Sequence, residues 1–187
     1  MKAKILFFFF VSSIGSYISC HANTTANRSQ SDSILIAYLN ECGIQTSTEN
    51  EVEILKSGHD KFIDLFEEIK KAKHHIHLEF YIFEDDALGQ MFSDALIDKA
   101  REGVEVRVLY DDVACWKVSQ SFYDRMRAGG VEVGSFLKVH FRRLTSKVNY
   151  RNHRKLVVVD GNVGFIGGMN IANRYIKGVS WGIWKDM

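Results

Sequence analysis

The sequence predicts an α/β fold, in which strands separated by helices form one sheet. From residue 52 onward, β-branched and aromatic runs alternate with segments whose apolar residues recur at helical spacing. Apolar residues make up 46% of the 187 residues, enough for a packed core, and three cysteines are too few for a disulfide scaffold. We therefore expect βαβ units and a sheet covered by helices on both faces.

Residues 1–22 have the pattern of a signal for secretion. Two lysines precede an uncharged apolar run that begins at Ile5, and small residues follow it. Three interpretations stay open: a lipoprotein signal with Cys20 as the lipidated residue, cleavage after Ala22, or an uncleaved membrane anchor. Because lysines favour the cytoplasmic side, we expect the domain on the extracytoplasmic side of the cell membrane.

Residues 23–44 predict a tether followed by a short helix. Ser, Thr and Asn dominate the start of this segment, a composition typical of a linker. Apolar residues then recur at helical spacing from Ile34 to Leu39, and Gly43 is suited to end the helix. Residues 45–187 are expected to form the folded domain.

The first half of this domain is predicted to hold two strands, each followed by a helix. Residues 52–55 are predicted as a short strand, and apolar residues at helical spacing follow in residues 60–73. Residues 76–83 form a long aromatic and β-branched run, which predicts a buried strand. Residues 87–102 again have one apolar helical face, and Gly103 ends this helix.

The second half begins with the same alternation and ends in a hairpin. Residues 104–108 alternate between apolar and polar side chains, which predicts a strand that continues into Leu109 and Tyr110. Residues 119–128 form the next predicted helix, which two glycines end, and residues 131–133 resume the sheet. Residues 156–159 and 163–166 are predicted as two strands with an Asp-Gly turn between them.

A block of positive charge lies between Lys138 and Lys155. It contains seven lysines and arginines and two histidines, and it contains no acid. The whole chain is nearly neutral, with 24 lysines and arginines against 23 acids for a formal charge of +1, so bulk charge does not predict a polyanion partner. The block predicts a local site for an anionic group, with a solvated basic loop as the alternative.

The candidate catalytic residues follow from this block. His153 and Lys155 lead into a buried strand, and we expect them on one face because side chains repeat every two residues. A neutral imidazole supplies a nucleophile for a phosphoryl group, and an ammonium neutralises phosphate oxygens. Gly167 and Gly168 allow backbone N–H groups to approach an anion, and Asn170 adds an amide donor. An ordinary hairpin would explain the glycines but not the histidine and lysine together.

The spacing of these residues resembles the active-site motif of the phospholipase D superfamily. The sequence reads His-x-Lys, four residues, Asp160, six residues and Gly-Gly-x-Asn, with every gap kept. The flanking residues 148–152 and 168–172 resemble the cardiolipin synthase branch of that superfamily, as do residues 79–83 upstream. The resemblance extends over residues 45–186.

The resemblance implies a phospholipase D-like sandwich, a central mixed sheet flanked by helices that forms one half of a two-lobed enzyme. It implies phosphatidyl transfer in two steps, with a phosphohistidine intermediate on His153. Lys155 and Asn170 would hold the phosphate oxygens, and Asp160 would fix local geometry. The expected reaction converts two phosphatidylglycerol molecules to cardiolipin and glycerol, and it requires no metal or other cofactor.

The family builds one active site from two such motifs, and this chain contains one. One interpretation is a chain truncated at its carboxyl end, which needs a complementary second half. The other is a homodimer that completes the site across a twofold axis. An exported homodimeric phosphodiesterase that acts on nucleic acid and an inactive phosphate-binding remnant are the alternative functions.

Other polar residues are further candidates for the site. Glu79 is a candidate to orient a histidine, with a hydrogen-bonded core carboxylate as the alternative. Asp111 and Asp112 lie at the carboxyl end of a predicted strand, where α/β sites form, and are candidates for a substrate role, with a turn or helix cap as the alternative. The histidines within residues 74–77 lack partner ligands at metal-site spacing, so no metal site is predicted.

Overall fold

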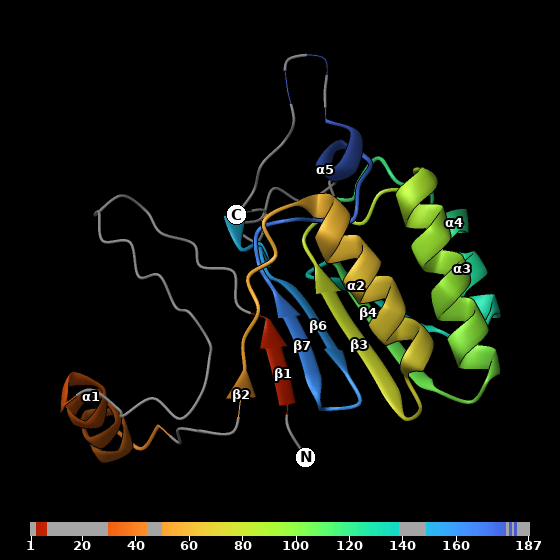
Figure 1. Cartoon of the computed structure of the whole chain (residues 1–187). Coiled ribbons are helices and arrows are strands. Elements are labelled where there is room, and N and C mark those ends of the chain that lie inside the picture. Colours follow the sequence, from red (N-terminus) through yellow and green to blue (C-terminus); the bar gives the residue numbers. More distant parts are fainter. Residues whose placement is uncertain are drawn as a thin grey trace.

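The structure of the chain, a computed structural model, describes residues 3–6, 30–44, 50–138, 149–178, 180 and 182. The described strands form one mixed seven-stranded sheet in the order β2-β1-β7-β6-β3-β4-β5 (Figure 1). The predicted α/β class is therefore confirmed. The strands are β1 (Ala3–Leu6), β2 (Asn50–Glu51), β3 (His75–Phe80), β4 (Glu105–Asp111), β5 (Glu132–Phe136), β6 (Lys155–Val159) and β7 (Val163–Ile166).

Parallel and antiparallel pairs meet at the centre of the sheet. β3, β4 and β5 are parallel neighbours, whereas β6 pairs antiparallel with both β3 and β7. The predicted turn between β6 and β7 is confirmed: Asn162 N–H donates to the Val159 carbonyl at 3.0 Å. Asp160 and Gly161 have φ values of 52° and 66°, the backbone conformation for which Asp-Gly turns are favoured.

Three helices cover one face of the sheet: α2 (Gly58–Lys71), α3 (Ala87–Arg101) and α4 (Gln120–Ala128) (Figure 1). A side-chain oxygen caps the amino end of each, from Ser57, Asp86 and Ser119 in turn. The predicted helices 60–73, 87–102 and 119–128 are therefore confirmed to within two residues. The remaining described helices are α1 (Gln30–Glu41) and the four-residue α5 (Arg174–Lys177).

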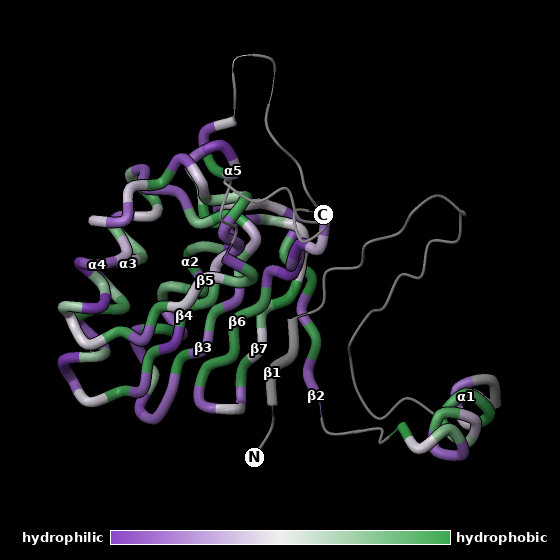
Figure 2. The backbone as a smooth tube through the Cα atoms, turned by 180° about the vertical axis from the view of Figure 1, so that it is seen from behind, coloured by the Kyte–Doolittle hydropathy of each residue, from purple (hydrophilic) through white to green (hydrophobic). Residues whose placement is uncertain are grey.

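The expectation that helices cover both faces is wrong for the described part of the chain. Along β3, Ile76, Leu78 and Phe80 are buried beneath the helices, whereas the residues between them are partly exposed. The connections from β3 to β4 and from β4 to β5 step across the sheet in one direction, and right-handed crossovers that step the same way place α3 and α4 on the same face. Figure 2 views the sheet from its open side.

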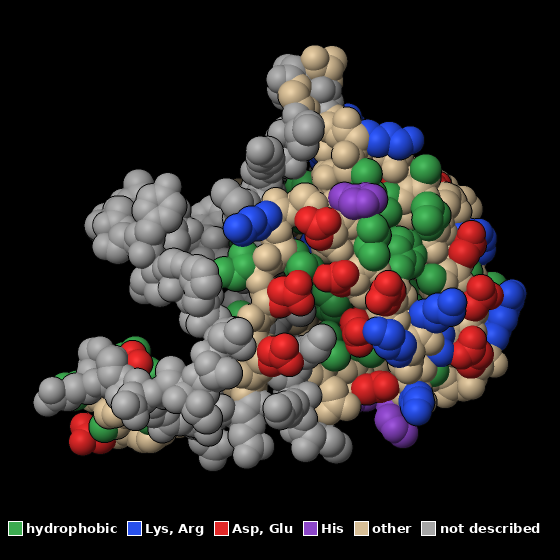
Figure 3. Space-filling model, viewed as in Figure 1, with side chains coloured by type: hydrophobic (Ala, Val, Ile, Leu, Met, Phe, Trp, Pro, Cys, Tyr) green, Lys and Arg blue, Asp and Glu red, His purple; other side chains and the backbone are tan. Residues whose placement is uncertain are grey.

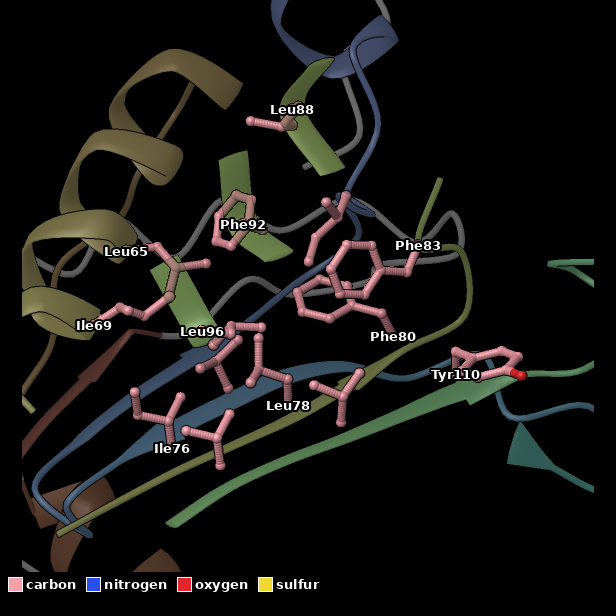
Figure 4. Packing of buried hydrophobic residues seen from close by; sticks show 14 of the residues in the cluster. Leu65, Ile69, Ile76, Leu78, Phe80, Phe83, Leu88, Phe92, Leu96 and Tyr110 are labelled. Carbon is pink, nitrogen blue, oxygen red and sulfur yellow. The ribbon is translucent and has the colours of Figure 1, made fainter. Parts of the chain in front are cut away.

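The core lies between the sheet and the three helices. Phe92 of α3 is fully buried and stacks on Phe66 of α2 with ring centroids 4.2 Å apart. Tyr123 of α4 stacks on Tyr110 of β4 at 3.9 Å. Side chains from the sheet, α2 and α3 point into the same space (Figure 4). The outer surface of the helices carries acids and bases side by side, as a solvated face does (Figure 3).

Two predicted strands differ in extent from the structure. Residues 52–55 have no regular structure: β2 ends at Glu51, and Leu55 packs into the core from the loop that follows. The strand predicted to reach Phe83 ends at Phe80. There the backbone N–H of Ile82 donates to the side chain of Asn170 at 2.9 Å, so the chain leaves the sheet.

Part of the amino-terminal segment lies in the sheet. β1 pairs parallel with β2 on one side and with β7 on the other, although it belongs to residues 1–22. Residues 7–29, including Cys20 and Ala22, lie outside the described residues. The predicted short helix is confirmed as α1, and Gly43 follows it at a φ of 73°. Among the described helices, none is both long and apolar enough to cross a bilayer.

Candidate active site

The carboxyl ends of β3 and β4 and the amino end of β6 meet at one edge of the sheet. β3 and β4 are parallel, and β6 runs antiparallel to β3 with Lys155 opposite Phe80. The segment that leads into β6 therefore lies beside the residues that follow β3 and β4. His153 belongs to this segment, and the carboxyl ends of strands are where α/β proteins place their sites.

His153 and Lys155 come together at this edge, but strand periodicity is not the reason. β6 begins at Lys155, so His153 lies in the irregular segment before it, and the expectation of a shared strand face is wrong. His153 is exposed, whereas Lys155 is 4% exposed and its ammonium donates a hydrogen bond to the carbonyl of His153.

Tyr81, which the sequence did not suggest as a site residue, contacts both of these side chains. Its ring centroid lies 4.6 Å from that of His153, at an interplanar angle of 61°, and 5.2 Å from the Nζ atom of Lys155. The second distance is within the range of a cation–π interaction. The available signal was its position directly after β3, at the edge where the motif begins.

The Gly-Gly-x-Asn segment is fixed behind these residues. Gly167 N–H donates to the Lys155 carbonyl at 3.3 Å, and Gly168 is half-buried next to it. Asn170 is 3% exposed: its Oδ1 accepts from Ile82 N–H, and its Nδ2 donates to the Tyr175 hydroxyl at 2.8 Å. An amide nitrogen carries two N–H groups, so these bonds use one of the two that Asn170 offers.

Asp160 lies at the opposite end of β6 from His153 and Lys155. The five residues of the strand separate the two ends by about 16 Å. The Asp160 carboxylate accepts three backbone N–H bonds, from Lys73, His74 and His75, at 2.8–2.9 Å. Burial alone would raise its pKa, but these bonds outweigh burial and hold the pKa of Asp160 below its ordinary value. The local geometry that Asp160 fixes is therefore the loop between α2 and β3.

Glu79 does not contact His153 through a hydrogen bond. Its carboxylate instead accepts one from the side-chain amide of Asn152, the residue before His153. At Asp111 the structure shows the turn that was the alternative to a substrate role: its Oδ1 accepts from the N–H groups of Val113 and Ala114 at 3.0 and 2.9 Å. The same carboxylate also reaches the segment before His153, through Asn152 N–H at 3.1 Å.

A hollow of about 530 Å³ lies beside His153 on the open side of the sheet. Its charged lining is mixed: two arginines face it together with one carboxylate, and one of the arginines, Arg151, is ion-paired with Asp111 at 3.2 Å. It is lined by Glu79, Leu109, Phe136, Arg151, Asn152, His153 and Arg154. Residues 139–148 of the basic block lie outside the described residues.

The histidines near the start of β3 lie at the end remote from this hollow. The rings of His75 and His77 are 4.8 Å apart, and His77 Nε2 lies 2.9 Å from Glu105 Oε1. The His77 hydrogen bond and the charge of Arg107 lower the pKa of Glu105. Within the described residues, no three His, Cys, Asp or Glu side chains are grouped so that they could hold a metal ion.

Comparison with known proteins identifies relatives over most of the folded domain. Residues 65–179 match the family described as "Cardiolipin synthase, PLD-like domain". Cardiolipin synthase of Geobacillus kaustophilus is 45% identical over 75% of this chain and 28% of its own length. The major cardiolipin synthase ClsA of Bacillus subtilis is 40% identical over 88% of this chain and 34% of its own length.

The chain thus spans about a third or less of the length of these curated relatives. Among solved structures, NucT from Helicobacter pylori aligns with a TM-score of 0.50 at 18% identity, over 63% of this chain and 70% of that one. This likeness bears on the fold alone. The family match and the relatives agree with the motif at the edge of the sheet, and the chain belongs to the cardiolipin synthase branch of the phospholipase D superfamily.

Proposed function

We propose that this chain carries one half of the active site of a phosphatidyltransferase of the cardiolipin synthase type. The observation that carries the proposal is the arrangement of His153 and Lys155 at the edge of the sheet. An exposed imidazole is open to a substrate, while a buried ammonium is fixed against the carbonyl of the same histidine. A nucleophile with an adjacent fixed cation suits attack on an anionic phosphodiester.

In the first step, a ring nitrogen of His153 attacks the phosphorus of phosphatidylglycerol. A nitrogen–phosphorus bond forms, the phosphorus–oxygen bond to the glycerol headgroup breaks, and the departing oxygen takes a proton from a general acid. In the second step, a hydroxyl of another phosphatidylglycerol loses its proton to that group and attacks the phosphorus. The nitrogen–phosphorus bond breaks, and the products are cardiolipin and free imidazole.

Lys155 and Asn170 supply charge and hydrogen bonds to the phosphate oxygens in this scheme. The Lys155 ammonium is buried, so its charge acts in a medium where electrostatic interactions are strong. The second N–H of the Asn170 amide serves as a donor, and the backbone of Gly167 and Gly168 leaves room for close approach of the anion.

A second copy of the motif must supply the general acid. The chain holds one such motif, and the parts aligned with it make up 28% and 34% of the two relatives. We propose that either a second copy of this chain or a complementary second half completes the site. The signal-like sequence pattern of residues 1–22 supports a location at the cell membrane, on its extracytoplasmic side, where a lipid substrate is available, although residues 3–6 of this segment pair in the sheet as β1.

The test is to trap the covalent intermediate. The full chain, alone and together with the remaining portion of a homologous cardiolipin synthase, is incubated with vesicles of phosphate-labelled phosphatidylglycerol and quenched in alkali, in which phosphohistidine survives. We expect a labelled adduct that His153→Ala abolishes. His59→Ala is the matched control, because His59 is an exposed histidine on α2.

The same assay separates the alternatives. Labelled DNA in place of lipid gives an adduct if the protein is a phosphodiesterase that acts on nucleic acid. A chain that yields no adduct with either substrate, alone or with the second half, contradicts the proposal. Label retained in His153→Ala contradicts the assignment of the nucleophile.

A further inference from the structure

Asp111 is a buried carboxylate at the edge of the sheet where His153 lies, and it accepts four hydrogen bonds. It ends β4 and is fully buried, at 0% exposure. A buried carboxylate is costly unless donors surround it. Three of the donors converge on Oδ1, from Val113 N–H, Ala114 N–H and the Arg151 guanidinium at 3.2 Å, whereas Asn152 N–H binds Oδ2 at 3.1 Å.

These four bonds have two destinations. The bonds from Val113 and Ala114 close the turn that follows β4. The bonds from Arg151 and Asn152 instead come from a segment 40 and 41 residues further along the sequence. Asp111 thus joins its own turn to the irregular segment that carries His153.

A second carboxylate holds the same segment from the neighbouring strand. Glu79 on β3 accepts a hydrogen bond from the Asn152 side chain, and Glu79 is paired in register with Leu109 of β4. Asp111 is two residues beyond Leu109, so strand alternation puts both carboxylates on the open side of the sheet. Asn152 is therefore held through its backbone by β4 and through its side chain by β3.

We propose that Asp111, assisted by Glu79, is a positioning residue that sets the place of His153. His153 follows Asn152 in the chain, so holding the backbone and side chain of Asn152 restricts where the backbone of His153 can lie. Its ring then meets Tyr81, the first residue after β3, at 4.6 Å. Hydrogen bonds to two adjacent strands thus fix the irregular segment next to the proposed nucleophile. The catalytic consequence rests on the proposed function, whereas the positioning itself does not.

Asp111→Asn distinguishes the bonds within the turn from the bond to Asn152. The amide has one oxygen, and the three donors at Oδ1 favour placing it there. The amide nitrogen then faces Asn152 N–H, donor against donor. We expect the turn and the Arg151 bond, which share the Oδ1 position, to persist, and the bond to Asn152 N–H at Oδ2 to be lost. Asp94→Asn is the matched control, because Asp94 forms an aspartate–arginine pair with Arg125 at 2.8 Å on the helical layer.

Two measurements on the full chain test the proposal. In Asp111→Asn, NMR hydrogen exchange of the Asn152 amide is expected to speed up roughly tenfold or more, while the Val113 and Ala114 amides keep their protection. The rate of adduct formation in the completed assembly is expected to fall by about tenfold or more, with the dependence on lipid concentration unchanged. Asp94→Asn should alter neither.

An unchanged Asn152 exchange rate in folded Asp111→Asn overturns the proposal, and so does an unchanged adduct rate in an active assembly. If the parent chain forms no adduct, the proposed function fails, and hydrogen exchange still decides the positioning. If Asp111→Asn does not fold, Glu79 decides it. Glu79→Gln keeps an acceptor for Asn152 and should preserve both the exchange rate of the Asn152 amide and the rate of adduct formation. Glu79→Leu should change both rates. Equal behaviour of the two variants refutes the positioning role.

Discussion

Replacing Asp160 separates a structural role from a catalytic one. Its carboxylate binds three backbone N–H groups of the loop between α2 and β3, at the end of β6 remote from His153. Asp160→Ala removes all three bonds. At about 1 kcal/mol each, because the loop is largely exposed, the free energy of unfolding falls by about 3 kcal/mol. The positive φ at this position adds about 1 kcal/mol for alanine.

Asp160→Asn is the informative partner of this variant. Asparagine tolerates the positive φ and keeps an oxygen for the N–H groups of His74 and His75, both of which bind Oδ1. It loses the charge and the Oδ2 bond to Lys73 N–H. We expect a loss of about 1 kcal/mol, measured by urea unfolding at pH 7.

The difference between the parent and Asp160→Asn should depend on pH in one direction. The folded pKa of Asp160 lies below its ordinary value, so its stabilisation is fully present above the unfolded pKa of about 4. It is lost as the pH falls through the folded pKa. The two unfolding curves should therefore converge in acid and stay apart at neutral pH.

Two results would refute this reasoning. One is an Asp160→Ala protein whose stability stays within about 0.5 kcal/mol of the parent, which would mean that the three bonds contribute nothing. The other is an Asp160→Asn protein that is as stable as the parent but forms no phosphohistidine. That result would place Asp160 in the chemistry despite its distance from His153.

Three further changes test the site and the core. Lys155→Ala should slow adduct formation by roughly a hundredfold, about 3 kcal/mol, because a fixed charge beside the phosphate is lost; an unchanged rate in folded protein would contradict its role. Tyr81→Leu should slow adduct formation while Tyr81→Phe keeps it, since the ring contacts His153 and Lys155; equal rates would mean that the ring is dispensable. Phe92→Ala should lower the free energy of unfolding by about 3–5 kcal/mol, measured in urea, and a loss below about 1 kcal/mol would contradict its central place in the core.

Most of the helices and strands could be predicted from local patterns. The helices α2, α3 and α4 follow apolar residues at helical spacing and end within two residues of the predicted positions, because burial of one face imposes that spacing. The open face of the sheet could also have been predicted from the sequence. In β4, Glu105 and Arg107 alternate with buried Val106 and Val108, which is the pattern of a strand with one covered face. The expectation of two covered faces came instead from the alternation of strands and helices along the chain.

The site could be predicted in part. His153, Lys155 and Asn170 are close in sequence, and the structure places them around one edge. Asp160 could have been separated from them, because a five-residue strand lies between it and Lys155. Tyr81 could not be assigned, since its contacts depend on the register that sets Phe80 opposite Lys155.

By itself, the sequence determined the fold class and the family and supplied the candidate nucleophile, because periodicity and motif spacing are properties of neighbours along the chain. The tertiary structure decided which carboxylate serves which purpose: Asp160 holds a remote loop, and Asp111 holds the segment of His153. The physical reason is that a hydrogen bond depends on distance in space. Residues 111 and 152 are brought within that distance by strand pairing, which local sequence does not encode.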